Sequence, residues 1–237
     1  MKRPHPQDVR AWYEAALDFF FPSLHACPGC GMPDTPITME TVGLCERCFS
    51  LFPRVKDREM PQNVWVAAHY EHAVCKLIHQ LKYKEAQYLA PVMAWQMAEG
   101  VGRGVLSEDA EEWVIVPVPL HPSRQRHRGY NQSQLLARHL TRYLKIPRED
   151  QALVRNKATT PLYRLNRQER KHTLANSMQI HPQAINRLHQ KKILLVDDIY
   201  TTGATAAACI KALKPAKPET VMVAAFALAD LQSHSVS

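Results

Sequence analysis

A stretch of thirteen residues late in the chain, "ILLVDDIYTTGAT", constrains the fold more than any other feature. Its four consecutive branched aliphatic residues, 193–196, predict a strand buried on both faces, because a strand with one wet face would alternate. Two adjacent carboxylates, Asp197 and Asp198, follow where we expect this strand to leave the sheet. The next segment, "TAAACIKAL", has the composition and apolar spacing of a helix. This order of strand, acidic pair, loop and helix is typical of a parallel α/β sheet.

The loop between the predicted strand and helix has the donors of a phosphate site. It consists of small residues, Thr201, Thr202, Gly203, Ala204 and Thr205. In open parallel sheets, ligands bind outside the carboxyl ends of the strands, where a helix N-terminus offers free N–H groups. The adjacent Asp197 and Asp198 suit a vicinal diol or a hydrated divalent cation. A solvated turn followed by a helix N-cap is the alternative interpretation of the acidic pair.

Strand-like and helix-like segments alternate over most of the remaining chain. The segments "VWVAAHY", "EEWVIVPVPL", "QALVR" and "TVMVAAFAL" have the apolar composition of strands. Residues 71–101 and "NQSQLLARHLTRYL" carry the apolar spacing of amphipathic helices. This alternation predicts an α/β fold with a parallel sheet flanked by helices, which we assign to residues 61–237.

Nothing in the sequence predicts a transmembrane segment, because no apolar run approaches the roughly 20 residues that a membrane span requires. The apolar stretch that contains Trp12, Phe19 and Phe20 is interrupted by charges and lacks a signal-peptide cleavage site. We expect a cytoplasmic protein. Its amphipathic N-terminal helix would pack on the four-cysteine element, dock on a partner or rest at the inner face of the membrane.

Four of the six cysteines form two pairs with two-residue gaps, Cys27, Cys30, Cys45 and Cys48. Thiolates with this spacing can close a tetrahedron around Zn²⁺. Two disulfides or four free thiols are the alternatives, although disulfides need an oxidising compartment. We expect residues 1–60 to hold an N-terminal helix and a zinc-ribbon-like element. Its zinc would be structural, supplying on the order of 10 kcal/mol of folding energy.

Positive charge is concentrated in one part of the chain. Residues 121–192 contain 16 Lys and Arg against 3 Asp and Glu, whereas the whole chain has a formal net charge of +8. Such a concentration of positive charge predicts anionic partners, either a multiply phosphorylated small molecule or nucleic acid. Within this part, Arg124, Arg126 and Arg128 precede a predicted helix, and guanidinium groups suit bidentate phosphate contacts. A basic surface that only aids solubility is the alternative.

Residues 193–205 closely resemble the signature of the type I phosphoribosyltransferases, which bind 5-phosphoribosyl-1-pyrophosphate (PRPP). Together with "LIHQLKYKEAQYLA", "PVPL", "RGYNQ" and the four cysteines, the chain resembles the ComF family (ComFC/GntX-like) over about residues 21–228. The resemblance implies a type I phosphoribosyltransferase-like parallel sheet with a small N-terminal zinc-binding domain. It also implies a role in natural transformation, in which single-stranded DNA enters the cytoplasm with the help of a ComFA-type helicase.

The resemblance also assigns roles to individual residues. Asp197 and Asp198 would contact the ribose hydroxyls and Mg²⁺, and the loop 201–205 would wrap the 5′-phosphate. Five further residues would lie near the pyrophosphate: Lys82, Val118, Pro119, Arg128 and Asn131. Residues 155–176 match a mobile basic lid.

Three positions depart from the pattern of the family. Tyr200 stands where an aliphatic residue is commoner, within the signature itself. In the lid, Leu162 replaces the usual Gln, and Thr173 replaces the usual Asn three residues after Arg170. The two lid departures weaken the case for catalytic contacts from the lid, but they do not affect the phosphate-binding signature.

Two functions fit these observations. In the first, the protein is a phosphoribosyltransferase that acts by positioning PRPP and neutralising the leaving pyrophosphate, although no residue stands out as a general base. In the second, the basic stretch 124–171 binds single-stranded DNA, with Tyr130, Tyr143 and Tyr163 either stacking on bases or packing in the core or on the surface. We favour a competence protein that binds PRPP with Mg²⁺ and assists DNA uptake. The alternative is a metabolic phosphoribosyltransferase with an unknown acceptor.

Overall fold

A four-stranded parallel sheet organises the residues that the computed structural model describes, 26–33, 38, 40–55, 60–83, 86–104, 112–155 and 177–229. Its strands are β1 (Val64–His69), β2 (Trp113–Pro117), β5 (Lys192–Tyr200) and β6 (Thr220–Leu228). They lie in the order β1-β6-β5-β2, and each neighbouring pair is parallel. The predicted parallel α/β sheet is therefore confirmed.

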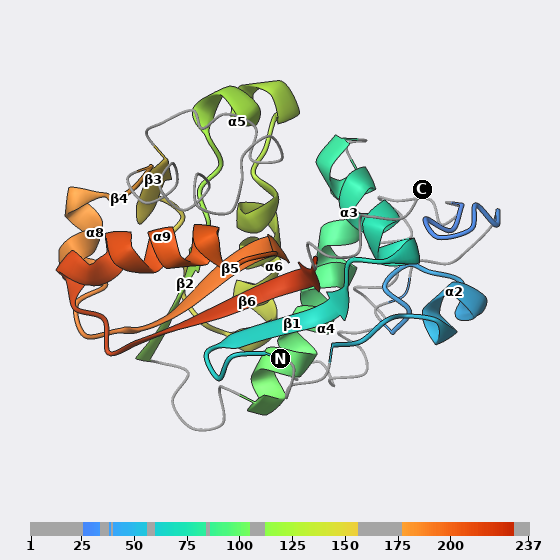
Figure 1. Cartoon of the computed structure of the whole chain (residues 1–237), viewed down its shortest axis with the longest axis horizontal. Helices are drawn as coiled ribbons and strands as arrows, with labels where there is room; N and C mark the ends of the chain where they lie inside the picture. Colours follow the sequence, from blue (N-terminus) through green and yellow to red (C-terminus); the bar gives the residue numbers. More distant parts are fainter. Residues whose placement is uncertain are drawn as a thin grey trace, which may run out of the picture.

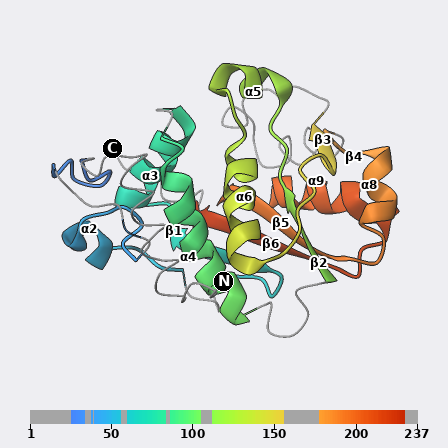
Figure 2. The same cartoon turned by 180° about the vertical axis from the view of Figure 1, so that it is seen from behind.

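Helices cover both faces of this sheet (Figures 1 and 2). Hydrophobic side chains from α3 (His72–Tyr83), α4 (Leu89–Gly104) and α6 (Gln132–Leu144) form one core with strand residues such as Phe226. The opposite core contains α8 (Pro182–Arg187) and α9 (Ala204–Leu213). Apolar side chains on both faces explain why the strands read as continuous hydrophobic runs.

The signature strand β5 lies in the interior of the sheet, between β6 and β2. Residues 193–196 are all buried, as the branched aliphatic run predicts. The strand continues past the acidic pair, however, and Tyr200 still pairs with Leu228 of β6. Asp197 and Asp198 thus lie within β5, two to three residues before its last residue Tyr200, and not beyond its end.

Two segments differ from the sequence prediction. The three arginines expected in a loop before a helix lie in a helix of their own, α5 (Pro122–Arg128), which stands off from the sheet (Figure 1). The His121 side chain accepts a hydrogen bond from the Ser123 N–H and caps this helix. The expected strand "QALVR" becomes β3 (Leu153–Arg155), which pairs antiparallel with β4 (Met178–Ile180) in a separate two-stranded sheet. This strand is therefore not part of the parallel sheet.

The cysteine element packs directly against the sheet domain. It contains the short helix α2 (Glu46–Ser50), and its buried Leu44 and Phe52 belong to the same hydrophobic core as α3, α4 and β6. The His69 N–H at the end of β1 donates to the Pro53 carbonyl at 2.7 Å. The division into residues 1–60 and 61–237 stays a prediction, with an apolar core that crosses it.

The remaining expectations on helices are partly met. Cys209 is buried in α9, as expected of a core cysteine, whereas Cys75 in α3 is half-buried. No helix in the described ranges is both long and apolar enough to cross a membrane. The N-terminal segment with Trp12, Phe19 and Phe20 lies outside the described residues.

Candidate functional site

The acidic pair near the carboxyl end of β5 is held by hydrogen bonds from two directions. The Ser133 hydroxyl, in the first turn of α6, donates to Asp197 Oδ1 at 3.0 Å. The backbone N–H of Asp198 donates to the same oxygen at 2.9 Å. Strand and helix together therefore fix the Asp197 carboxylate, so little conformational entropy remains to be lost when a ligand binds.

A lysine from a distant part of the chain neutralises the second carboxylate. Lys82, in the last turn of α3, places Nζ 2.7 Å from Asp198 Oδ2. Both side chains are largely shielded from solvent, with 17% and 13% of their surface exposed. The structure thus brings together two residues that the sequence analysis assigned to one site.

The electrostatics of the pair favour a cation or a proton between its members. Burial, followed by the adjacent charge of Asp198, raises the pKa of Asp197 to about 7. The Asp198 N–H, the Lys82 ammonium and the Ser133 hydroxyl oppose this rise but do not cancel it. At neutral pH the Asp197 carboxyl is therefore only partly ionised, and a divalent cation would displace its proton.

The loop after the acidic pair has a backbone that only glycine adopts easily at one position. Gly203 has φ +73° and precedes the first residue of α9, Ala204, whose N–H donates to the Thr202 hydroxyl at 3.4 Å. A Cβ on Gly203 would lie 2.5 Å from the Tyr200 hydroxyl oxygen. The tyrosine that departs from the family pattern thus lies directly beside the turn into α9. Thr201 and Thr205 complete this loop, and neither is buried.

The loop after β2 is tied to the start of α6 by one asparagine. The Asn131 side-chain amide donates to the Val118 carbonyl at 3.0 Å, and its oxygen accepts from the Ser133 N–H at 3.0 Å. Asn131 is only 4% exposed. Its hydrogen bonds hold Val118, and with it the next residue Pro119, beside the helix end that carries Ser133.

Arg128 makes its contacts at the outer rim of this region. Its Nη2 donates to the Tyr83 hydroxyl at 2.9 Å, and its Nη1 donates to Gln132 Oε1 at 3.2 Å. The Tyr130 hydroxyl donates to the Leu81 carbonyl. The "RGYNQ" motif therefore joins α5 and α6 to the last turn of α3, where Lys82 lies.

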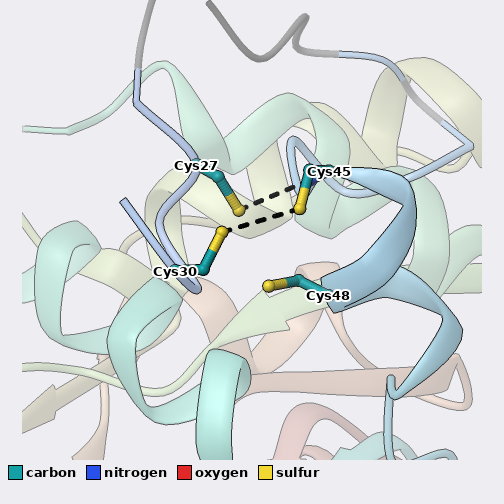
Figure 3. Close-up of side chains that lie close together, drawn as sticks. All are labelled: Cys27, Cys30, Cys45 and Cys48. Atoms are coloured by element: carbon teal, nitrogen blue, oxygen red, sulfur yellow. Dashed lines mark hydrogen bonds between the residues drawn. The ribbon is translucent and has the colours of Figure 1, made fainter. Parts of the chain in front are cut away.

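The four paired cysteines converge on one point (Figure 3). Their sulfur atoms all lie within 4.8 Å of one another, and Cys30 and Cys45 are 3.7 Å apart. Zinc–sulfur bonds of about 2.3 Å in a tetrahedron require sulfur separations close to the 3.7 Å between Cys30 and Cys45. The four thiols therefore fit a tetrahedral metal ion with no open position for chemistry.

The surroundings of the cluster favour a thiolate at Cys27 but oppose one at Cys48. Burial opposes ionisation of Cys27, but the N–H groups of Cys45, Cys30 and Gly29 lower its pKa to about 7. Burial and the other three cysteines raise the pKa of Cys48 to about 12. Without a cation the four thiols cannot all ionise at neutral pH, whereas a bound Zn²⁺ would remove this conflict.

The two described tyrosines proposed to stack on bases have other contacts. Tyr130 is half-buried and hydrogen-bonded to α3, and the Tyr143 ring packs edge-on against Trp95 at a centroid separation of 5.3 Å. Tyr163, Leu162, Arg170 and Thr173 lie outside the described residues, as does the lid after Arg155.

Several known proteins are similar to this chain. Residues 131–234 match the family model "Phosphoribosyl transferase domain". "Competence protein F" of Haemophilus influenzae is 29% identical over 67% of this chain and 69% of that protein. "Competence protein ComFC" of Bacillus subtilis is 25% identical over 78% of this chain and 71% of that protein. "DNA utilization protein YhgH" of Escherichia coli K12 is 31% identical over 186 residues, which are 76% of this chain and 74% of that protein.

The chain belongs to the ComF family. This ComF protein contains the phosphoribosyltransferase-like sheet and the N-terminal cysteine cluster that its sequence predicts.

Three residues of this ComF site escape sequence analysis. Ser133 and Gln132, at the start of α6, contact Asp197 and Arg128, and Tyr83 forms the other partner of Arg128. The sequence gives no signal for Ser133, which looks like an ordinary polar residue in the first turn of a helix, and Gln132 lies in the "RGYNQ" motif without an assigned role. Tyr83 could be found by its position after Lys82, at the end of the apolar spacing of α3.

Proposed function

We propose that this ComF protein binds PRPP together with Mg²⁺ at Asp197, Asp198 and the loop 201–205. The observation that carries the proposal is the buried acidic pair held by Ser133 and Lys82, close in sequence to the glycine turn at the start of α9. Acidic groups for a diol and helix N–H groups for a phosphate match the two chemistries of a phosphoribosyl ligand.

The residues of the proposed site would contact different parts of the ligand. Asp197, held by Ser133, would accept hydrogen bonds from ribose hydroxyls once its proton is lost. Lys82 would leave Asp198 and turn to the pyrophosphate, because both are anions within reach of its flexible chain. Mg²⁺, when bound, would neutralise part of the pyrophosphate charge. Arg128, Asn131, Val118 and Pro119 form the proposed remaining wall of this site.

For the biological role, we propose that the protein assists the uptake or use of single-stranded DNA in the cytoplasm. The support is the names of its relatives, two competence proteins and one DNA utilization protein. Arg124, Arg126 and Arg128 on α5 supply positive charge for such a partner. A ComFA-type helicase is the proposed protein partner. A phosphoribosyltransferase of base or nucleotide metabolism, with no role in DNA handling, is the second candidate, favoured by the match to the phosphoribosyl transferase domain.

The cysteine cluster is proposed to hold a structural zinc ion through Cys27, Cys30, Cys45 and Cys48. The support is the 3.7 Å separation of Cys30 and Cys45 and the four ligands that the cluster offers. Four protein ligands leave no place for a substrate, so the metal would stabilise the element without taking part in chemistry.

Calorimetric titration of PRPP with Mg²⁺ tests the ligand. The double variant Asp197→Asn, Asp198→Asn keeps the shape of both side chains and removes their charges. We expect wild type to bind and the double variant to lose at least about tenfold in affinity, that is about 1.4 kcal/mol. Asp150→Asn is the matched control, because Asp150 pairs with Arg148 and makes no described contact with the acidic pair. Absence of binding by folded, metal-loaded wild type would refute the proposal.

A further inference from the structure

An exposed aromatic side chain stands at the end of α3. Tyr83 is 56% exposed, and among the described residues it is the one aromatic side chain in the set of exposed large hydrophobic residues. The residue before it, Lys82, contacts Asp198. Tyr83 therefore lies at the rim of the acidic pair, with much of its ring facing solvent.

The Tyr83 ring is held in place from two sides. The Arg128 guanidinium lies over the ring, 4.8 Å from its centroid, and also donates to its hydroxyl. The His79 ring, one turn earlier on α3, has its centroid 4.9 Å from that of Tyr83. Arg128 is itself held by Gln132. A ring fixed in this way loses little entropy when a planar ligand stacks on it.

The charge around this aromatic group is positive. Neither α3 nor α5 contains an acidic residue, and α5 presents Arg124 and Arg126 in addition to Arg128. Aromatic and guanidinium planes surrounded by positive charge are the combination that binds nucleobases carried on phosphates.

We propose that Tyr83, His79 and Arg128 form a stacking platform for a nucleobase whose sugar and phosphate extend toward Lys82. The base belongs either to a single-stranded nucleic acid or to a free nucleotide, and the chemistry of recognition is the same for both. The platform takes over the stacking role that the sequence suggested for Tyr130 and Tyr143, whose described contacts are with α3 and Trp95. This inference deepens the proposed function. It rests on the proposed PRPP site for one point only, the direction in which the sugar extends from the base.

A purely structural brace between α3 and α5 is the competing explanation for these contacts. Three substitutions at Tyr83 separate the two. Tyr83→Phe keeps the ring but loses the hydrogen bond to Arg128, so it damages the brace and spares the platform. Tyr83→Leu keeps apolar bulk but removes the π-face. Tyr83→Trp enlarges the π-face.

The decisive assay is fluorescence anisotropy with two labelled probes of equal charge, an oligo(dT) of about twelve nucleotides and an abasic strand of the same length. At about 150 mM salt we expect wild type to prefer oligo(dT) by about 5- to 150-fold, the range for one stacked base. Tyr83→Leu should bind both strands as weakly as wild type binds the abasic strand. Tyr83→Phe should keep the preference, and Tyr83→Trp should increase it.

Calorimetry with thymidine 5′-monophosphate tests the free-nucleotide source. Binding of the monophosphate that Tyr83→Leu abolishes, without a preference for oligo(dT), would support the platform and assign it to a small ligand. If wild type shows neither a preference nor monophosphate binding, or if Tyr83→Leu leaves both unchanged, the platform is refuted. Titration of PRPP into wild type and into Asp197→Asn, Asp198→Asn separates the two proposals, because PRPP binding should depend on the acidic pair, whereas the preference for oligo(dT) should depend on the Tyr83 ring. Absence of PRPP binding by wild type, with the preference for oligo(dT) over the abasic strand intact, would refute only the PRPP site.

Discussion

Replacing Asp197 by Asn should make the protein more stable at alkaline pH. Burial and the charge of Asp198 raise the pKa of Asp197 from 3.8 to about 7. The folded state therefore binds the proton more tightly than the unfolded state, and stability falls as the pH rises from about 4 to about 7. A rise of this size corresponds to about 4 kcal/mol at a pH above both values.

The hydrogen bonds of the side chain set the size of the expected effect. In Asp197→Asn the side-chain amide oxygen can still accept from Ser133 and from the Asp198 N–H, so the substitution removes charge while it keeps both contacts. The pKa of about 7 already includes the opposing effect of Lys82, so we expect a gain of about 1 to 4 kcal/mol in the free energy of unfolding at pH 8. At pH 5, where the unfolded carboxyl is already largely ionised, the gain should fall to about 0.5 to 1.7 kcal/mol.

Urea unfolding of the metal-loaded protein between pH 5 and pH 8 measures these values. The wild-type free energy of unfolding should decline over this range more steeply than that of Asp197→Asn. Asp150→Asn, which removes a carboxylate from the exposed pair with Arg148, should follow the wild-type slope. Equal slopes for wild type and Asp197→Asn, or a variant less stable than wild type at pH 8, would refute the reasoning.

Four further predictions concern other parts of the site and fold. Lys82→Met should weaken PRPP binding at least about tenfold in calorimetry, because it removes the ammonium group that would turn from Asp198 to the pyrophosphate; unchanged affinity would contradict the role of Lys82. Gly203→Ala should cost about 1 to 3 kcal/mol in urea unfolding, because φ is +73° and the new Cβ meets the Tyr200 hydroxyl; adding Tyr200→Val should restore only the part due to overlap. Cys45→Ser should lower the zinc content measured by atomic absorption and the melting temperature together, whereas Cys75→Ser should change neither by much. Gly100→Ala should destabilise the fold without changing zinc content, because its Cβ would lie 1.7 Å from a Trp65 ring atom.

The local sequence pattern was sufficient to predict elements in which consecutive side chains are all buried. Residues 193–196 form a buried strand because every side chain in the run is apolar, and α9 begins where the glycine of the signature allows a positive φ. The cysteine pairs likewise converge because each short gap fixes two sulfur atoms on one side of the backbone.

The sequence pattern failed where structure depends on distant contacts or on caps. Helix α5 has no apolar period, so its only local signals are the capping His121 and the proline that follows it. The strand β3 pairs with β4 across a long intervening segment, and no spacing rule specifies that partner. The ion pair of Lys82 with Asp198 joins α3 to β5, and only the resemblance to the ComF family predicted that the two residues share a site.

The course of α3 has a consequence for regulation. Near its first turn, Ala73 lies against Gly29 of the cysteine element, and Lys76 donates to the Gly29 carbonyl. At its last turn, the same helix delivers Lys82 to Asp198. Helix α3 thus connects the cysteine cluster to the acidic pair. Coupling between two binding sites is reciprocal. If a ligand at the acidic pair changes the affinity of the cysteine cluster for a metal by some factor, the metal changes the affinity for that ligand by the same factor. With favourable coupling, loss of the metal or oxidation of its thiolates would weaken ligand binding at the acidic pair.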